Sequence, residues 1–377
     1  MRKIILIISC LMILLSCRGS VTSPNNTDNN SGNITEEPAE PPMTEEELNK
    51  YGLEIDTATA ENIRESLEKY FKDNGEYKLI LKGVSTKMYT GYVNLAIIIG
   101  EIKDITYITV SFKNVQFQNN KLPDNILGST SFDNNNITKV ILPDYITAFG
   151  DEVFFQCISL TEVNMPKSLT EIGISIFVHT KVKNISLPNG LKIINDNAFS
   201  MSDIENIDIP DSVIRIGEYV FASCYKLQSV KLSENLSVID KFTFSDCPAL
   251  KTITIPESVT SIEDLAFYAC SGAENIMFEG TNPKLTTIGD SAFGYCRKLT
   301  TITIPATVIS IVDLVFSTCE SLTSITFLSA NPPSINGDNT FKGTILKNIY
   351  VPKGASSAYE SLKGKHGISA DVVISEI

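Results

Sequence analysis

Hydrophobic residues recur along most of this chain at a nearly constant spacing. Short runs alternate apolar and polar residues, and each run is followed by further apolar positions three or four residues apart. Each pattern includes one phenylalanine, and successive phenylalanines lie 22 to 26 residues apart, at Phe132, Phe154, Phe177, Phe199, Phe221, Phe244, Phe267, Phe293, Phe316 and Phe341. Self-similarity at such a period indicates a stack of structural repeats.

Each unit reads L-x-x-I-x-I-P-x-x-V-x-x-I-x-x-x-A-F-x-x-C. The alternating part, as in Leu322–Phe327, predicts a half-buried strand. The proline that follows in most units ends the strand, because it cannot donate to a ladder. The later apolar positions predict a tight returning coil rather than a long helix. Because one coil cannot bury its own inward residues, we expect the coils to stack and their strands to form a parallel sheet along one side.

Residues 44–115 lack the repeat and predict a small α/β N-terminal cap. Apolar spacing predicts helices over Ala58–Phe71 and Leu95–Ile99, and strands over Tyr77–Gly83 and Ile105–Phe112. The first helix would bury one face, made of Ile63, Leu67, Tyr70 and Phe71. We expect the last of these strands to start the repeat sheet and cover its first apolar edge.

The first residues resemble an export signal. Arg2 and Lys3 precede an apolar stretch, Ile4–Leu15, that is typical of a signal peptide and short for a bilayer span. The sequence Leu14-Leu15-Ser16-Cys17 resembles a bacterial lipobox, which implies cleavage of residues 1–16 and a lipid on the Cys17 sulfur. An ordinary signal peptide with an incidental cysteine is the alternative. The polar, acidic segment 17–43 predicts a flexible tether behind that cysteine.

Two units carry a family resemblance. "LKTITIPESVTSIEDLAFYAC" (Leu250–Cys270) and "LTTITIPATVISIVDLVFSTC" (Leu299–Cys319) resemble the BspA-type bacterial leucine-rich repeat. The resemblance implies an α/β-type repeat solenoid, with leucine-rich repeats of about 23 residues over 116–345 and a parallel sheet on one face. It also implies a short C-terminal cap over 346–377, made of a strand, a proline turn and a short helix. Members of this family are expected to be secreted or surface proteins that bind other molecules.

Charge and composition argue against several classes of function. The chain has 377 residues, and 31 Lys and Arg face 44 Asp and Glu, for a net charge of -13, so a nucleic-acid-binding face is not expected. Only two histidines occur, His179 and His366, and both are predicted at the surface. Neither a phosphate-binding loop nor a metal motif is present. The sequence therefore predicts no cofactor, no metal site and no enzyme activity.

One position of the repeat is usually cysteine. Thr180 and Ser202 take the same position in two units, and the six cysteines are Cys157, Cys224, Cys247, Cys270, Cys296 and Cys319. Small residues that pack inside the stack explain all eight, so we predict buried free thiols. Disulfides between neighbouring coils and a metal site are the alternatives.

The two residues flanking the central apolar residue of each strand should point away from the core. Most are Ser, Thr or Asn, which suit hydrogen bonding to an extended protein chain or a glycan, and Met277 and Tyr350 could serve as anchors. A merely solvated sheet is the alternative. The candidate ligand-binding residues are Asn206, Asp208, Ser229, Lys231, Thr252, Thr254, Asn275, Met277, Thr301, Thr303, Ser324, Thr326 and Tyr350.

These observations predict a lipid-anchored leucine-rich repeat protein of the bacterial cell envelope, exposed on the outer membrane. Its partner would be a protein or glycan of the host matrix or of a partner cell, bound in adhesion. The alternative is a periplasm-facing lipoprotein that scaffolds other envelope proteins.

Overall fold

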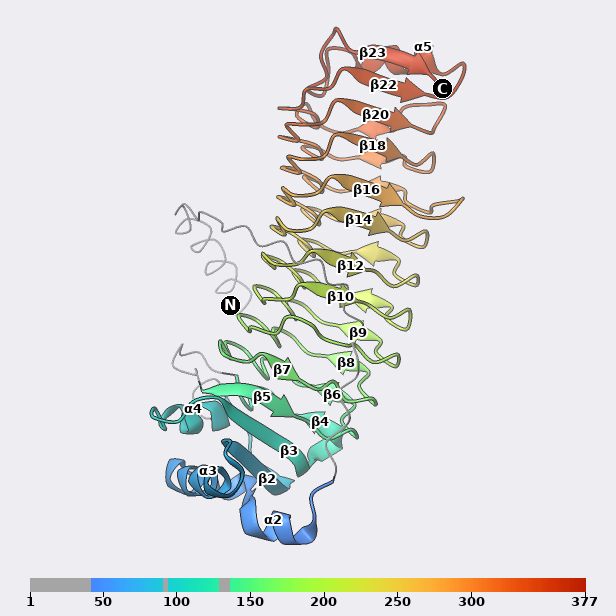
Figure 1. Cartoon of the computed structure of the whole chain (residues 1–377). Coiled ribbons are helices and arrows are strands. Elements are labelled where there is room, and N and C mark those ends of the chain that lie inside the picture. The colour runs from blue at the N-terminus through green and yellow to red at the C-terminus, as the bar shows by residue number, and fades with distance from the viewer. Residues whose placement is uncertain (1–41, 91–93, 129–135) are drawn as a thin grey trace. The chain divides into compact units, whose positions relative to one another are not determined.

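Short strands that repeat once per coil build most of the molecule (Figure 1). The computed structural model describes residues 42–90, 94–128 and 136–377. The signal peptide, Cys17, nearly all of the tether and Phe132 lie outside these residues. Within the unit Thr44–Ile377, successive coils pair in register, so the predicted repeat solenoid is confirmed.

The N-terminal cap is a parallel sheet with helices. It consists of α2 (Glu45–Tyr51), β1 (Gly52–Glu54), η1 (Ile55–Thr57), α3 (Ala60–Asn74), β2 (Lys78–Ser85), α4 (Leu95–Gly100) and β3 (Ile108–Phe117). Both predicted helices and both predicted strands are present, although β3 begins later and runs further than predicted. The prediction for Phe71 is wrong: Ile63 and Leu67 are buried, but Phe71 is 43% exposed and stacks on Tyr77.

The first strand of the repeats continues the cap sheet. β3 pairs in parallel with β5, and β5 pairs with β7, so the cap covers the first coil as predicted. The strands that follow, β10 onward, pair in parallel wherever they pair. Their bounds are β5 (Ile137–Ile141), β7 (Glu162–Val163), β10 (Asn206–Asp208), β12 (Ser229–Lys231), β14 (Thr252–Ile255), β16 (Asn275–Phe278), β18 (Thr301–Ile304), β20 (Ser324–Phe327), β22 (Asn348–Val351) and β23 (Val373–Glu376).

A second ladder of two-residue strands follows the proline turn of each coil. It forms two parallel five-stranded sheets, which the sequence did not predict, in addition to the predicted parallel sheet. The second residue of each strand, which is isoleucine except for Leu122 and Phe149, faces inward and adds a second wall to the core. The strands are β4 (Lys121–Leu122), β6 (Ala148–Phe149), β8 (Glu171–Ile172), β9 (Ile193–Ile194), β11 (Arg215–Ile216), β13 (Val238–Ile239), β15 (Ser261–Ile262), β17 (Thr287–Ile288), β19 (Ser310–Ile311) and β21 (Ser334–Ile335).

The third side of each coil, which we call the turn face, is a run of tight turns around the repeat phenylalanine. Two residues four apart, such as Leu265 and Ala269, have left-handed φ values of 56° and 58°. Backbone N–H groups of these turns donate to carbonyl oxygens of the following coil, as from Phe244 to Ala266 at 2.8 Å. The turn face is therefore held by hydrogen bonds between coils, like the two strand ladders.

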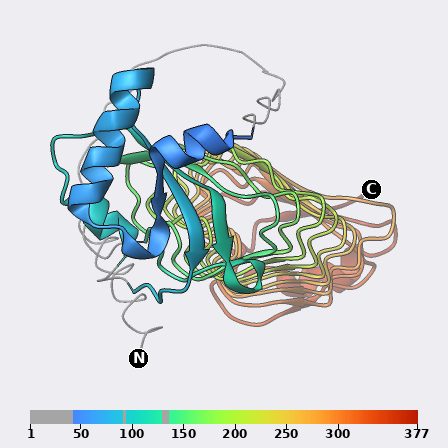
Figure 2. The ribbon, with the colours of Figure 1, turned by 90° about the horizontal axis from the view of Figure 1, so that it is seen from below.

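The repeat phenylalanines form one continuous stack through the core. From Phe154 to Phe341, consecutive ring centroids are 5.2 to 5.9 Å apart, and the ring planes differ by 5 to 24°. Every ring in this stack is 0% exposed. Seen from the cap end, the coils lie one behind another (Figure 2). The regular Phe spacing of the sequence therefore becomes a single column of rings.

The C-terminal end combines predicted and unpredicted elements. The strand β22, the short helix α5 (Ser356–Tyr359) and the proline turn between them were predicted. The turn η3 (Glu360–Leu362) and the strand β23 were not, and β23 extends the sheet in parallel with β22. Tyr359 is buried against Phe327, with ring centroids 5.2 Å apart, and covers the apolar end of the core.

Candidate functional site

The candidate ligand-binding residues lie on one surface, which we call the polar sheet face. In-register pairing aligns them in two columns, with Asn206 beside Ser229 and Asp208 beside Lys231 at one end. Further along, Thr301 pairs with Ser324, and Ser324 pairs with Asn348. The ladder is interrupted between β12 and β14 and between β16 and β18. The face therefore consists of aligned segments rather than one unbroken sheet.

Alternation along each strand sends these side chains outward. The central residues, such as Ile253 and Ile302, are buried, while the flanking Thr252, Thr301 and Thr303 are exposed. Met277 is 50% exposed, whereas Tyr350, the other predicted anchor, is largely buried and only partly exposed. Thr254, Ser324 and Thr326 are intermediate as well. The prediction that these positions point away from the core is confirmed.

Few side chains of this face bond to one another. Ser229 Oγ donates to Asn206 Oδ1 at 2.6 Å, and Ser324 Oγ donates to Thr301 Oγ1 at 3.2 Å. Toward the cap, the equivalent positions are used internally: Glu162 pairs with Lys139 at 2.9 Å, and Asn164 bonds the Leu142 backbone in both directions. The part of the face that offers polar groups to a partner therefore begins after Asn164, with the exposed Asn184 and Ser186.

The repeat cysteines are buried free thiols, as predicted. Cys270 Sγ donates to the Phe244 carbonyl of the preceding coil at 3.2 Å, and four of the other thiols make the same bond to the phenylalanine of the preceding coil. The remaining thiol, Cys157, donates to the Leu127 carbonyl at 3.2 Å. Burial raises the pKa of Cys157, Cys224, Cys270 and Cys319 to about 12. A thiol that stays protonated and enclosed is a poor nucleophile, so these residues have a packing role.

Both histidines are partly exposed, and each also packs against its surroundings. His179 is half-buried on the turn face, and burial lowers its pKa below the ordinary range. His366 is half-buried at the C-terminal end, where its Nδ1 lies 2.6 Å from the Gly337 carbonyl oxygen. The two histidines belong to different parts of the fold and do not form one site.

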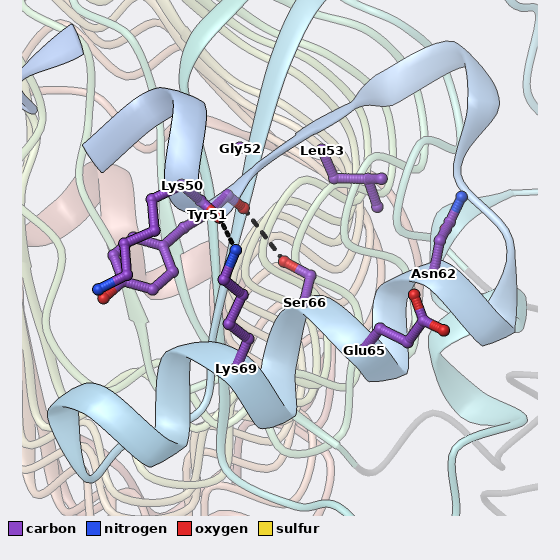
Figure 3. Close-up of a pocket in the computed structure, with 8 residues that line it drawn as sticks. All are labelled: Lys50, Tyr51, Gly52, Leu53, Asn62, Glu65, Ser66 and Lys69. Atoms are coloured by element: carbon purple, nitrogen blue, oxygen red, sulfur yellow. Dashed lines mark hydrogen bonds between the residues drawn. The ribbon is translucent and has the colours of Figure 1, made fainter. Parts of the chain in front are cut away.

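The N-terminal cap contains a shallow hollow between α3 and the segment from α2 to β1 (Figure 3). Lys69 donates to the Lys50 carbonyl at 2.6 Å, and Ser66 donates to the Tyr51 carbonyl at 3.1 Å. Lys50 also pairs with Asp73 at 2.9 Å. The polar groups around the hollow thus bond to one another and hold the cap together. We therefore assign the hollow no ligand.

Metal clusters and membrane-spanning helices are both absent from the described residues. Within residues 42–90, 94–128 and 136–377, no three His, Cys, Asp or Glu side chains gather where they could hold a metal ion. In the same part of the chain, no helix has both the length and the apolar character needed to cross a bilayer.

Comparison with protein families decides the classification. A family model described as a BspA type leucine rich repeat region matches six copies, over residues 90–205, 192–293 and 238–362. The chain belongs to the BspA-type leucine-rich repeat family. Members of leucine-rich repeat families are typically binding scaffolds without enzyme activity. No curated protein matches the chain.

One of the similar solved structures, from Bacteroides ovatus, agrees with the fold of this BspA-type protein. A leucine-rich repeat protein from Bacteroides ovatus is 25% identical, with a TM-score of 0.56 over 71% of this chain and 70% of that chain. A leucine-rich repeat protein from Eubacterium ventriosum is 17% identical, with a TM-score of 0.48 over 80% of this chain and 79% of that one. A leucine rich cell surface protein from Faecalibacterium prausnitzii is 22% identical, with a TM-score of 0.40 over 71% and 83%.

Proposed function

We propose that this BspA-type protein binds an extended segment of a partner protein on the polar sheet face. The observation that carries the proposal is the alignment of exposed Ser, Thr and Asn side chains in two columns on a rigid sheet. Strand pairing fixes their spacing at about 4.8 Å from coil to coil. A partner therefore meets polar groups that are already positioned, which reduces the entropy lost on binding.

Several weak contacts have to act together on such a face. A hydrogen bond contributes a net free energy of about 0.5–1.5 kcal/mol, because water is displaced from both partners. Met277, exposed between the threonine-bearing strands β14 and β18, adds an apolar contact. Tyr350 adds a partly exposed aromatic ring at the C-terminal end, and aromatic residues often dominate interface energies.

We further propose that the protein is displayed on the cell surface by a lipid on Cys17. The apolar segment Ile4–Leu15, the lipobox-like sequence before Cys17 and membership of the BspA-type family support this location. A lipid holds a protein on a membrane surface, and the polar segment after Cys17 would give the repeats reach. The role that follows is adhesion to a host matrix or to a partner cell.

The binding experiment compares two charge-matched double variants of the full chain. Thr301→Lys with Thr303→Lys places two cations on the polar sheet face, and Thr260→Lys with Thr286→Lys places two beside the second strand ladder. All four threonines are exposed. We expect the first variant alone to lose binding to immobilised matrix proteins at least tenfold. Equal loss in both variants, or none in the first, would reject this face.

The location is tested by protease treatment of intact cells. Loss of the protein while a periplasmic control stays intact is the expected result. Survival until the outer membrane is opened would instead support the alternative, an envelope scaffold that faces the periplasm. Labelling with a radioactive fatty acid, compared between the wild type and Cys17→Ala, tests the anchor itself.

A further inference from the structure

In the middle of the solenoid, the turn face carries aromatic side chains. Tyr225, Tyr268 and Tyr295 take positions that hold Asp203, Ser200 and Met201 in the coil of Phe199, nearer the cap. We define the turn-face aromatic cluster as Tyr225, Tyr268, Tyr295 and Arg297. It lies on a different side of each coil from the polar sheet face.

These rings add little to the core. Tyr225 is 52% exposed and Tyr295 is 36% exposed, whereas every ring of the phenylalanine stack is fully buried. Tyr268 and Tyr295 have centroids 5.1 Å apart and planes tilted by 57°. Gly294 makes room for this arrangement, because a Cβ there would lie 3.2 Å from Tyr268 Cδ2. The cluster is an assembled surface feature beside a core that is complete without it.

The backbone also disfavours an aromatic residue at one of these positions. Tyr295 has a left-handed φ of 61°, which is uncommon for a bulky residue. The other coils also have a left-handed residue at this position, as at Met201 with a φ of 56° and Ala269 with a φ of 58°, so the conformation belongs to the repeat. A small residue such as Ala269 therefore satisfies the fold at this position, and the partly exposed ring of Tyr295 is not needed for it.

Charges around the cluster are arranged in pairs. The Arg297 guanidinium lies 5.7 Å from the centre of the Tyr295 ring, and its Nε lies 3.7 Å from Glu320. Lys298 lies 4.0 Å from Glu274, and Lys226 is 2.8 Å from Asp203 on the other side of the cluster. Asp246, half-buried, accepts a hydrogen bond from Tyr225. A strongly charged ligand would have to compete with these internal pairs.

The size of the cluster favours a small ligand unit over a protein surface. An aromatic side chain can bury about 150–250 Å², so these three partly exposed rings offer on the order of 300 Å². A stable protein interface needs about 800 Å² on each side. Sugar rings are of the right size, since each has flat C–H faces that stack on aromatic rings and hydroxyl edges that hydrogen-bond.

We propose that the turn-face aromatic cluster binds an uncharged glycan, whose sugar rings stack on Tyr225, Tyr268 and Tyr295. The neighbouring Arg297 and Glu320 supply a donor and an acceptor for sugar hydroxyls. This second surface is separate from the polar sheet face, so the protein holds a protein partner and a glycan on different sides of the same coils.

The test is native gel electrophoresis of the full chain through gels containing an uncharged polysaccharide: a β-glucan, a mannan or starch. We expect at least one of these to retard the wild type, and heparin, a charged polymer, to act no more strongly. A triple variant, Tyr225→Ala with Tyr268→Ala and Tyr295→Ala, should lose the retardation at least tenfold. Tyr107→Ala, which removes a ring that is 78% exposed in the cap, is the matched control. Thermal melting checks that each variant folds.

Conservative variants separate stacking from mere folding. Tyr295→Phe keeps the ring and should retain the retardation, whereas Tyr295→Asn relieves the left-handed strain but removes the ring and should reduce it. The chain has no tryptophan, so quenching of tyrosine fluorescence gives a second readout. Retardation by heparin alone, no retardation by any of the three polysaccharides, or equal retardation of the triple variant would overturn the proposal. The Thr301→Lys and Thr303→Lys variant should behave as wild type, which keeps the two surfaces distinguishable.

Discussion

Single side chains explain why the repeat tolerates some substitutions and not others. At the cysteine position, the thiol donates to the carbonyl of the phenylalanine in the preceding coil, as Cys247 does to Phe221 at 3.1 Å. Thr180 Oγ1 donates instead to the Phe177 carbonyl of its own coil at 2.9 Å, and Ser202 Oγ lies 3.7 Å from the Cys224 sulfur. The position therefore accommodates small residues that can form a hydrogen bond inside the stack, which accounts for cysteine, serine and threonine alike.

Removing one ring from the phenylalanine stack should be costly. Phe244 lies 5.2 Å from the rings on both sides, so Phe244→Ala leaves a cavity enclosed by neighbouring coils. We expect the free energy of unfolding to fall by about 3–5 kcal/mol, measured by urea denaturation. Phe71→Ala, at a partly exposed ring outside the stack, should cost much less. Equal effects would show that the stack does not dominate the core.

The buried thiols make stability depend on pH in the alkaline range. Their ordinary pKa is near 9.0, and burial raises the pKa of Cys270 and Cys319 to about 12. Above pH 9 the unfolded chain loses protons that the folded chain keeps, so the free energy of unfolding falls as pH rises toward 12. Each thiol contributes up to about 1.4 kcal/mol per pH unit. Cys247→Ser combined with Cys270→Ser should make this slope shallower in denaturation curves from pH 8 to 10.5; an unchanged slope would contradict the assignment.

At the scale of the element, aspartates link the turns that follow the second strand ladder. Asp264 Oδ1 accepts the Asp290 N–H at 3.0 Å, and the same bond joins Asp151 to Ile174 and Asp313 to Asn339. The carboxylate supplies an acceptor for an N–H of the following coil. Without it, this N–H would lack a partner, which is costly for a backbone group shielded from water. The turns are thus connected by side chains where the strands are connected by backbone.

Asp264 allows a direct test of this link. Asp264→Ala removes the acceptor of the Asp290 N–H, and we expect a loss of about 1–3 kcal/mol in unfolding free energy. Asp264→Asn keeps an oxygen at this position and should lose less, chiefly the exposed ion pair with Lys241 at 2.7 Å. Hydrogen exchange of the Asp290 amide should accelerate in the alanine variant only. If both variants exchange alike, the side-chain bond is not what protects that amide.

Regular elements were predictable, and those set by local bonding were not. The alternation in Leu322–Phe327 predicted the strands, and the Phe period predicted the core, because both patterns reflect which side chains are buried. The helix α2 was missed because its acidic sequence has no apolar periodicity and depends on the Thr44 capping box. The left-handed turns were missed because residues such as Leu265, rather than glycine, fill them. The alternation also predicted that the side chains of the polar sheet face point outward. It does not predict a ligand, because the coils are nearly identical and none of them marks the centre of a binding site.

Across the whole molecule, each coil contacts chiefly its two neighbours. The strand ladders, the turn-face hydrogen bonds and the ring stack all join one coil to the next. Stability is then close to a sum of coil and interface contributions, with caps needed to cover the two apolar ends. The cap sheet covers one end by pairing β3 with β5, and Tyr359 with β23 covers the other.

This organisation predicts that a complete coil can be removed without loss of the fold. Deleting residues 251–273 joins Leu250 to Glu274, which takes the repeat position of Lys251. The strands, the turns and the ring stack therefore stay in register. We expect a soluble protein with an unchanged circular dichroism shape and a modestly lower melting temperature, since one interface is lost. Deleting residues 251–262 removes only the strand side of that coil and leaves Phe267 out of register, so this variant should aggregate. If both deletions aggregate, the coils are not interchangeable, and the longer-range packing of the solenoid rather than nearest-neighbour contact sustains the fold.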